Sequence, residues 1–113
     1  MAKKRIYELR TYTTIDGRMP ALQARFKNHT LKLFEKHGIR NEIYWTPLDD
    51  ERKDNTLIYV VSHESRDAAD KGWKAFGADP DWQKAREASE ADGKIVSKVE
   101  RVWLKPTDYS PRK

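Results

Sequence analysis

The sequence contains no cysteine among its 113 residues. The chain therefore forms no disulfide, holds no thiolate zinc site or Cys-ligated iron–sulfur cluster, and has no cysteine nucleophile. Long apolar runs are also missing: none approaches the ~20 residues of a membrane span, and no signal-peptide pattern opens the chain. The G-x-G-x-x-G, P-loop and G-x-S-x-G motifs are absent, which argues against the common nucleotide-binding and serine-hydrolase sites. We expect a cytoplasmic protein that uses none of these chemistries.

The positive charge is concentrated at the two ends of the chain. The formal net charge is +5, and the basic residues at positions 3–5 and 112–113 account for all of it. The body between them is neutral, whereas a domain that reads nucleic acid carries a basic stripe on one folded face. The distribution argues against nucleic acid as a partner and is typical of solubilising ends.

The order of periodic segments predicts one α+β domain over residues 1–113, with 1–4 and 106–113 as tails. Alternating or continuous apolar patterns predict strands, and apolar steps of three and four predict helices. This order, β-α-β-β-α-(α)-β, is the ferredoxin-like pattern, in which helices cover one face of an antiparallel four-stranded sheet. The expected strands are 5–12, 42–46, 56–62 and 95–104, and the expected helices are 20–37, 65–76 and 79–92.

The third expected strand predicts a homodimer. Residues 57–61 are apolar on both faces of the strand, which implies cover on both faces of the sheet. The helices cover only one face, and an open apolar sheet of this size exceeds what soluble monomers normally expose. The pattern therefore favours two copies packed sheet to sheet, the commonest closed assembly.

Two of the three histidines are candidate catalytic residues. His29 falls on the apolar stripe of the first expected helix, so we expect it to be buried, as a base, a ligand or a satisfied core residue. His63 follows the central strand, where it is either functional or simply exposed. His37, before Gly38, is explained by the end of a helix. The histidine spacing predicts no metal site, and no cofactor is predicted, although haem, which needs only one axial histidine, is not excluded.

Charged side chains on the outer expected strands allow two interpretations. Glu8 and Arg10 share one face of the first strand, and we expect an ion-pair network across the dimer interface. The alternative is that Arg10 or Arg101 binds a substrate carboxylate.

The aromatic content predicts a ligand pocket between the sheet and the helices. Most of the aromatic residues belong in the core, because large rings dominate burial. A cluster in the second half of the chain is suited to walling a flat apolar pocket, and a few polar groups would orient the ligand. The residues expected to line this pocket are Arg10, Tyr12, Tyr44, Trp73, Phe76 and Trp82.

The segment Ile6-Tyr-Glu-Leu-Arg-Thr-Tyr12 resembles the opening strand of the NIPSNAP family, and similar matches follow at 34–39, 44–46, 78–82 and 104–111. The resemblance covers nearly the whole chain. It implies a dimeric α/β-barrel, in which two ferredoxin-like sheets face each other. It leaves the activity open, because proteins related by fold include cofactor-free monooxygenases, haem-binding enzymes and isomerases, and fold does not fix function.

Three functions follow from these observations. The first is a homodimer that binds a small apolar or aromatic molecule in each subunit. The second is a cofactor-free monooxygenase, isomerase or haem-binding enzyme that uses His29 or His63. The third is a protein-interaction module. The first ranks above the second because the sequence contains no visible catalytic constellation.

Overall fold

The computed structural model describes residues 5–112, so the expected tail at residues 1–4 lies outside the described residues. The observed order of elements matches the expected one, with bounds that differ by a few residues. The elements are β1 (Ile6–Thr14), α1 (Met19–Arg25), η1 (Phe26–Thr30), α2 (Leu31–Lys36), β2 (Arg40–Trp45), β3 (Thr56–His63), α3 (Arg66–Ala78), α4 (Pro80–Ser89) and β4 (Val96–Leu104).

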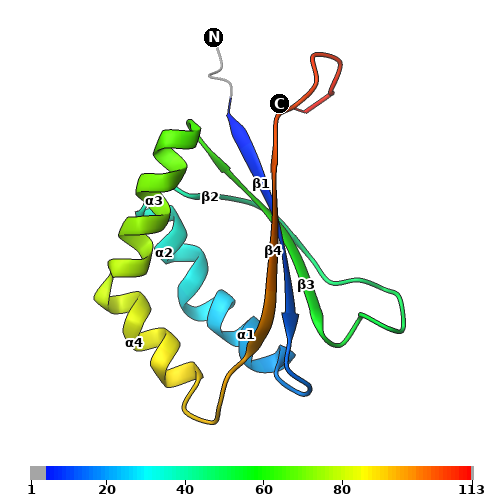
Figure 1. The fold of residues 1–113 in the computed structure, drawn as a ribbon, viewed down its shortest axis with the longest axis vertical. Coiled ribbons are helices and arrows are strands. Elements are labelled where there is room, and N and C mark those ends of the chain that lie inside the picture. The colour runs from blue at the N-terminus through cyan, green and yellow to red at the C-terminus, as the bar shows by residue number, and fades with distance from the viewer. Residues whose placement is uncertain (1–4, 113) are drawn as a thin grey trace.

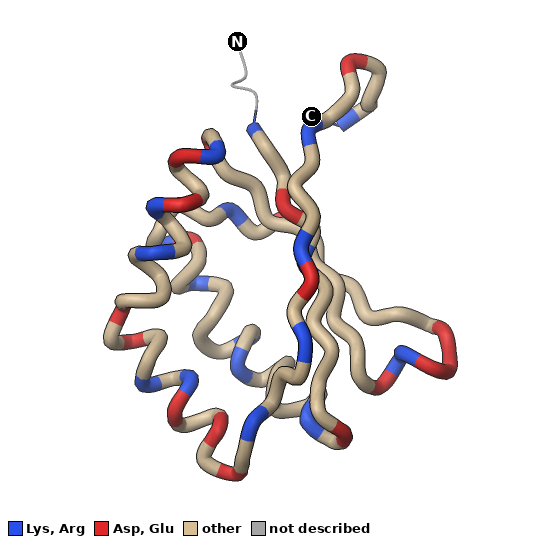
Figure 2. The backbone as a smooth tube through the Cα atoms, in the orientation of Figure 1, with Lys and Arg blue, Asp and Glu red and all other residues tan. Residues whose placement is uncertain are grey.

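The four strands form one antiparallel sheet in the order β2-β3-β1-β4. The first and last strands of the chain are neighbours, and the helices lie on one side of the sheet (Figure 1). This is the α+β ferredoxin-like arrangement that the sequence predicts. Acidic and basic residues are interspersed over helices and strands alike, in agreement with a neutral body (Figure 2).

A π-helical turn interrupts the first long helix. The backbone N–H of Leu31 donates to the carbonyl of Phe26, five residues earlier, so η1 holds one more residue than an α-helical turn. This wider turn places Phe26 and Thr30 on the buried side and leaves His29 exposed. The expectation that His29 is buried is therefore wrong, because regular α-helical spacing does not hold through η1.

The core lies between the sheet and the helices, and aromatic rings fill much of it. Phe34 contacts Tyr59, Trp73 and Phe76, with ring centroids 4.9–6.2 Å apart. Burying each large apolar side chain contributes about 1.5–3 kcal/mol. The buried core residues are Met19, Leu22, Phe26, Leu33, Phe34, Ile39, Leu57, Tyr59, Val61, Phe76 and Ile95.

The junction between α3 and α4 is tied to the end of α2. Asp79 caps α4 by accepting a hydrogen bond from the backbone N–H of Asp81 at 2.8 Å. The Asp79 carboxylate also contacts Lys36 Nζ at 2.9 Å and His37 Nε2 at 2.7 Å. His37 is the C-cap residue of α2 and Gly38 follows with a φ of +77°, which confirms the interpretation of His37 as a helix-terminal residue.

The face of the sheet that points away from the helices is apolar and uncovered. Along β3, Leu57, Tyr59 and Val61 point toward the helices, whereas Ile58 and Val60 point to the open face. The open face is completed by Ile43 and Trp45 of β2, Leu9 of β1, and Val102 and Leu104 of β4. Within residues 5–112, no helix has the length and apolar character needed to cross a membrane.

Candidate functional site

Glu8 is the centre of a buried polar cluster on the helix-covered face of β1. Its carboxylate accepts hydrogen bonds from Arg10 Nη1 at 2.8 Å, His63 Nε2 at 2.9 Å and Trp73 Nε1 at 2.8 Å. The three donors come from β1, β3 and α3, and Glu8 itself is 0% exposed. We call these four residues the Glu8 cluster.

The Glu8 carboxylate is held in its charged form. Burial alone would raise its pKa, but hydrogen bonds from His63, Arg10 and Trp73 outweigh burial and lower the pKa from 4.5 to about 2. An ionised carboxylate only accepts hydrogen bonds, so the proton in the contact with His63 lies on Nε2.

The Arg10 guanidinium is engaged on all three of its nitrogens. Besides Glu8, Arg10 Nε donates to the Tyr59 hydroxyl at 2.7 Å and Nη2 donates to the Tyr12 hydroxyl at 3.2 Å. The guanidinium also lies 4.4 Å from the centre of the Trp73 ring, within cation–π range. Burial alone would lower the pKa of Arg10. The Tyr59 and Tyr12 hydroxyls and the Glu8 carboxylate outweigh burial and raise this pKa above its usual value.

His63 is buried, with one ring nitrogen unpartnered. It is 1% exposed, so the interpretation as an exposed strand-end residue is wrong. With Nε2 bonded to Glu8, Nδ1 is the remaining polar atom of the ring, and it is buried with no partner within residues 5–112. The Trp73 and Trp103 rings pack beside the imidazole, with centroids 6.0 and 5.8 Å away. A bound molecule could therefore form a hydrogen bond with His63 at Nδ1 without displacing Glu8.

Two of the expected pocket residues, Tyr12 and Tyr44, lie on either side of Tyr59. Tyr44 stacks on Tyr59 with centroids 4.8 Å apart and an interplanar angle of 11°. Tyr59 donates a hydrogen bond of 3.0 Å to Tyr12. Burial raises the pKa values of Tyr44 and Tyr59, so both hydroxyls stay protonated at neutral pH. The three tyrosines extend the polar cluster toward β2.

The other expected pocket residues form a wall of rings along α3 and α4. Phe76 lies 6.0 Å from Trp73 and 4.6 Å from Trp82, measured between ring centroids. Trp73 connects this wall to Arg10 and Glu8. The structure thus brings all six expected ligand residues into one continuous set of contacts, and their rings occupy space between the sheet and the helices.

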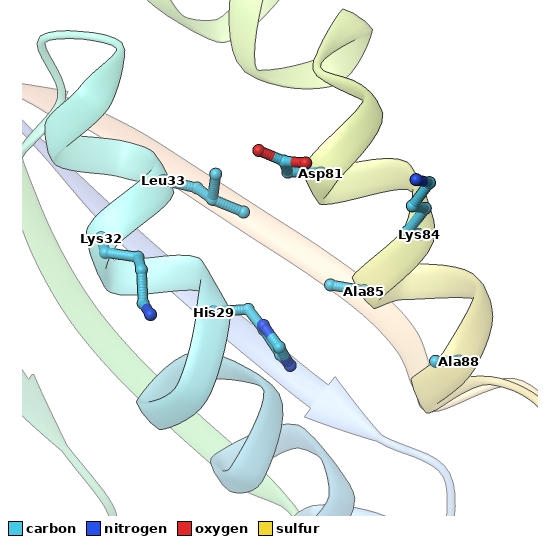
Figure 3. Close-up of a pocket in the computed structure, with 7 residues that line it drawn as sticks. All are labelled: His29, Lys32, Leu33, Asp81, Lys84, Ala85 and Ala88. Atoms are coloured by element: carbon cyan, nitrogen blue, oxygen red, sulfur yellow. The ribbon is translucent and has the colours of Figure 1, made fainter.

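His29 lies elsewhere, at a cavity between η1, α2 and α4 with a volume of about 420 Å³. In Figure 3, His29 and Asp81 extend toward the gap from opposite helices, with Leu33 and Ala85 between them. The structure does not bring His29 into the Glu8 cluster. The lining residues are His29, Lys32, Leu33, Asp81, Lys84, Ala85 and Ala88.

The contact between Glu8 and Arg10 lies within one chain. Both side chains point to the helix side of the sheet, so the expected ion-pair network across a sheet-to-sheet interface is wrong for these two residues. Arg101 lies opposite Arg10 on β4, and its Nε is 3.6 Å from Glu8 Oε2. The Arg101 side chain is 43% exposed, because the helices leave the helix-side face of β4 uncovered.

The sequence analysis did not predict Glu8 as the partner of His63, because the two residues lie on different strands. In the antiparallel register His63 pairs with Ile6, which places Glu8 two residues along β1 on the same face. Strand pairing combined with side-chain alternation was the signal that could have found this contact. The donation from Trp73 to Glu8 has no comparable signal, because it depends on how α3 crosses the sheet.

The described side chains form no site suited to a metal ion or to haem. Within residues 5–112, no group of three or more His, Asp or Glu side chains is arranged to hold a metal ion. His63 has Nε2 bonded to Glu8 and packs against Trp73 and Trp103, so those rings would have to move before it could ligate haem. The Glu8 cluster therefore does not fit haem.

The chain is thus a small ferredoxin-like domain with a buried polar cluster, the Glu8 cluster, between its sheet and its helices. The sequence model of the NIPSNAP family matches residues 7–111, and this chain belongs to the NIPSNAP family. Among curated proteins, none matches this chain.

Three solved structures of NIPSNAP proteins have a similar fold. A family protein of unknown function from Agrobacterium tumefaciens is 21% identical, with a TM-score of 0.80 over 98% of this chain and 96% of that one. A second from A. tumefaciens is 18% identical, with a TM-score of 0.82 over 96% and 99%. An uncharacterised NIPSNAP-like domain protein from Burkholderia xenovorans is 15% identical, with a TM-score of 0.80 over 97% and 91%. At these identities the similarity establishes the fold and leaves the activity open.

Proposed function

We propose that this protein is a homodimer that binds a small apolar or aromatic molecule in each subunit, beside the Glu8 cluster. The observation that carries the proposal is the buried, unpartnered Nδ1 of His63 next to an aromatic wall and an uncovered edge strand. A buried polar atom without a partner calls for an explanation, and a ligand or a water that donates to it is one. Apolar walls with a few fixed polar groups are typical of small-molecule sites. The expected cytoplasmic location stays a prediction.

The helix-side face of β4 is the entrance in this proposal. Val99 and Arg101 lie on this face and remain exposed, while the corresponding positions on β1 and β3 are covered by helices. A ligand that entered along β4 would meet Val99 first and then Trp103, the outer ring beside His63. The aromatic side chains between the sheet and the helices would form its inner wall.

The apolar open face of the sheet supports dimerisation, because a second copy of the chain would cover it. It presents a continuous apolar surface across all four strands, which is unusual on a soluble monomer. Its rim carries Arg40 and Glu42 on β2 and Lys98 and Glu100 on β4. A two-fold interface brings the same surface of each subunit together, and a rim with both charge signs can pair with itself.

Two valines on β4 allow the dimer and the ligand site to be tested separately. Val102 points to the open face and is 50% exposed, whereas Val99 points to the helix side and is 47% exposed. Both positions lie on β4 and are similarly exposed, so substitution by Asp should affect the stability of the strand to a similar extent at each. We expect Val102→Asp to give a monomer that still binds ligand, and Val99→Asp to give a dimer that binds poorly.

The measurements are light scattering for the dimer and thermal shift with a panel of small aromatic compounds for the ligand site. A ligand that binds only the folded state raises the melting temperature. If Val102→Asp stays dimeric, the sheet-to-sheet interface is wrong. If no compound stabilises the wild type, or if Val99→Asp is stabilised as much as the wild type, the ligand site is wrong, and an interaction module becomes the better account.

The contact between Glu8 and His63 favours an isomerase-type enzyme as a second candidate. The carboxylate orients the imidazole through Nε2 and leaves Nδ1 as the ring nitrogen that could exchange a proton with a bound molecule. His63→Gln should then abolish conversion of a bound compound while the dimer persists. Conversion unchanged in His63→Gln would contradict this role.

A further inference from the structure

Two positive charges, Arg10 and Arg101, have the single carboxylate of Glu8 as their counterion. Arg10 and Arg101 are direct cross-strand partners, and like charges in this position repel each other. Glu8 is their shared carboxylate, and its Oε2 is 2.8 Å from Arg10 but 3.6 Å from Arg101, beyond hydrogen-bond distance. Two guanidiniums therefore share one carboxylate, which only Arg10 contacts closely.

The Arg101 guanidinium is held in place but has free donors. It donates no side-chain hydrogen bond within residues 5–112, and its side chain is 43% exposed. It lies 5.0 Å from the centre of the Trp103 ring, and the Arg66 guanidinium lies 4.0 Å from the same ring. Stacking on an aromatic ring orients a guanidinium while leaving its N–H groups available for a planar anion.

We propose that Arg101 binds the carboxylate of the ligand, so that the ligand is an apolar or aromatic monocarboxylate. A single carboxylate supplies the one negative charge that the Arg10–Arg101 pair lacks. Arg66, at the same tryptophan ring, is paired with Asp70 at 3.4 Å and adds little net charge. Val99, two residues before Arg101 on the same face, offers an exposed apolar contact for the body of the ligand. This inference rests on the proposed ligand site.

The geometry separates the roles of the two arginines. Arg10 has a partner on each nitrogen, so a ligand could reach it only by displacing Glu8, Tyr12 or Tyr59. Arg10 is therefore a positioning residue that holds Glu8, and Arg101 is the residue that contacts the ligand.

The test uses phenylacetate as the probe and phenylacetamide as its neutral counterpart. Each is titrated into the full chain and followed by the NMR signal of the Trp103 indole N–H. We expect phenylacetate to shift this signal and to bind at least about tenfold more tightly than phenylacetamide, because a charge-assisted hydrogen bond is lost in the amide.

Two variants with the same change in charge provide the comparison. Arg101→Gln should weaken phenylacetate binding by about tenfold to a hundredfold and leave phenylacetamide binding unchanged. Lys27→Gln removes one charge from an exposed lysine on η1 and should change neither affinity by more than about twofold. Since Arg101 is partly exposed, the variant is expected to fold, and its circular dichroism spectrum checks this.

The outcomes distinguish this inference from the proposed function. Equal binding of the two probes, or phenylacetate binding unaffected by Arg101→Gln, would overturn the carboxylate assignment and leave the ligand site standing. Failure of both probes to bind the wild type, when other aromatic compounds stabilise it, would also overturn the assignment. Failure of every compound would overturn the ligand site itself.

Discussion

Glu8 and His63 lie 55 positions apart in the sequence and are joined by a hydrogen bond of 2.9 Å between Glu8 Oε1 and His63 Nε2. Trp73 donates to the same oxygen at 2.8 Å. One carboxylate oxygen thus connects β1, the end of β3 and α3. Both Glu8 and His63 are buried, so this connection is formed away from water and depends on the charge of Glu8.

Replacing Glu8 by Gln should strongly destabilise the protein. The substitution leaves Arg10 buried without its counterion, and breaking one side of a buried ion pair costs about 3–5 kcal/mol of the free energy of unfolding. Glu87→Gln is the control, because Glu87 is exposed on α4 and its side chain forms no ion pair within residues 5–112. It should cost less than about 0.5 kcal/mol. Urea unfolding measures both, and equal losses would contradict a central role for Glu8.

Stability should fall in acid because the folded state lowers the pKa of Glu8 from 4.5 to about 2. The contribution of Glu8 is complete above about pH 4.5 and is lost as the pH falls toward 2, since the unfolded chain then binds the proton first. The contacts with Lys36 and His37 lower the pKa of Asp79 and act in the same direction.

The two carboxylates can be separated by urea unfolding between about pH 6 and about pH 3. We expect Asp79→Asn to retain the part of the acid slope that comes from Glu8, and Glu8→Gln to lose it. Should the wild-type free energy of unfolding be flat over this range, the lowered pKa of Glu8 would be wrong.

Trp73→Phe tests the hydrogen bond to Glu8 without removing the aromatic ring. We expect a loss of about 1–2 kcal/mol in the free energy of unfolding beyond the effect of the smaller ring, because Glu8 loses one of its three donors. Trp82→Phe is the matched control, since Trp82 packs on Phe76 and makes no side-chain hydrogen bond within residues 5–112. Thermal or urea unfolding compares them, and a larger loss in the control would contradict the contribution of the Trp73 donor.

Two glycines on α3 should respond in opposite directions to substitution by Ala. A Cβ at Gly72 would lie 2.9 Å from the His37 carbonyl oxygen and 3.2 Å from Ile39 Cγ1, so Gly72→Ala should destabilise by about 1–3 kcal/mol. A Cβ at Gly77 would meet nothing within 4 Å, and Gly77→Ala should stabilise by up to about 1 kcal/mol. Melting temperatures test the pair, and an unchanged melting temperature in Gly72→Ala would show that α3 does not pack so closely.

The parts of the structure that follow from local patterns could be predicted from the sequence. Side-chain alternation placed Glu8 and Arg10 on one face of β1, and the expected helix starts at 65 and 79 coincide with the observed N-caps of α3 and α4. The apolar run in β3 correctly indicated a sheet with two apolar faces. These features depend on residues close together in the chain.

The features that depend on tertiary packing could not be predicted in this way. The π turn at η1 exposes His29, although regular spacing would bury it. The sequence showed that Glu8 and Arg10 share one face of β1. It did not show that the helices cover this face. The hydrogen bond from Trp73 to Glu8 could not be predicted either, because it depends on where α3 packs on the sheet.

The most direct test of the dimer and the ligand site is native mass spectrometry of the gently purified 113-residue chain. It reports the assembly and any retained molecule together. We predict a dimer of about 27 kDa, twice the 13.3 kDa chain, that carries additional non-covalent mass and becomes a monomer in Val102→Asp. A wild-type monomer without added mass would contradict both the sheet-to-sheet dimer and the ligand site beside Glu8.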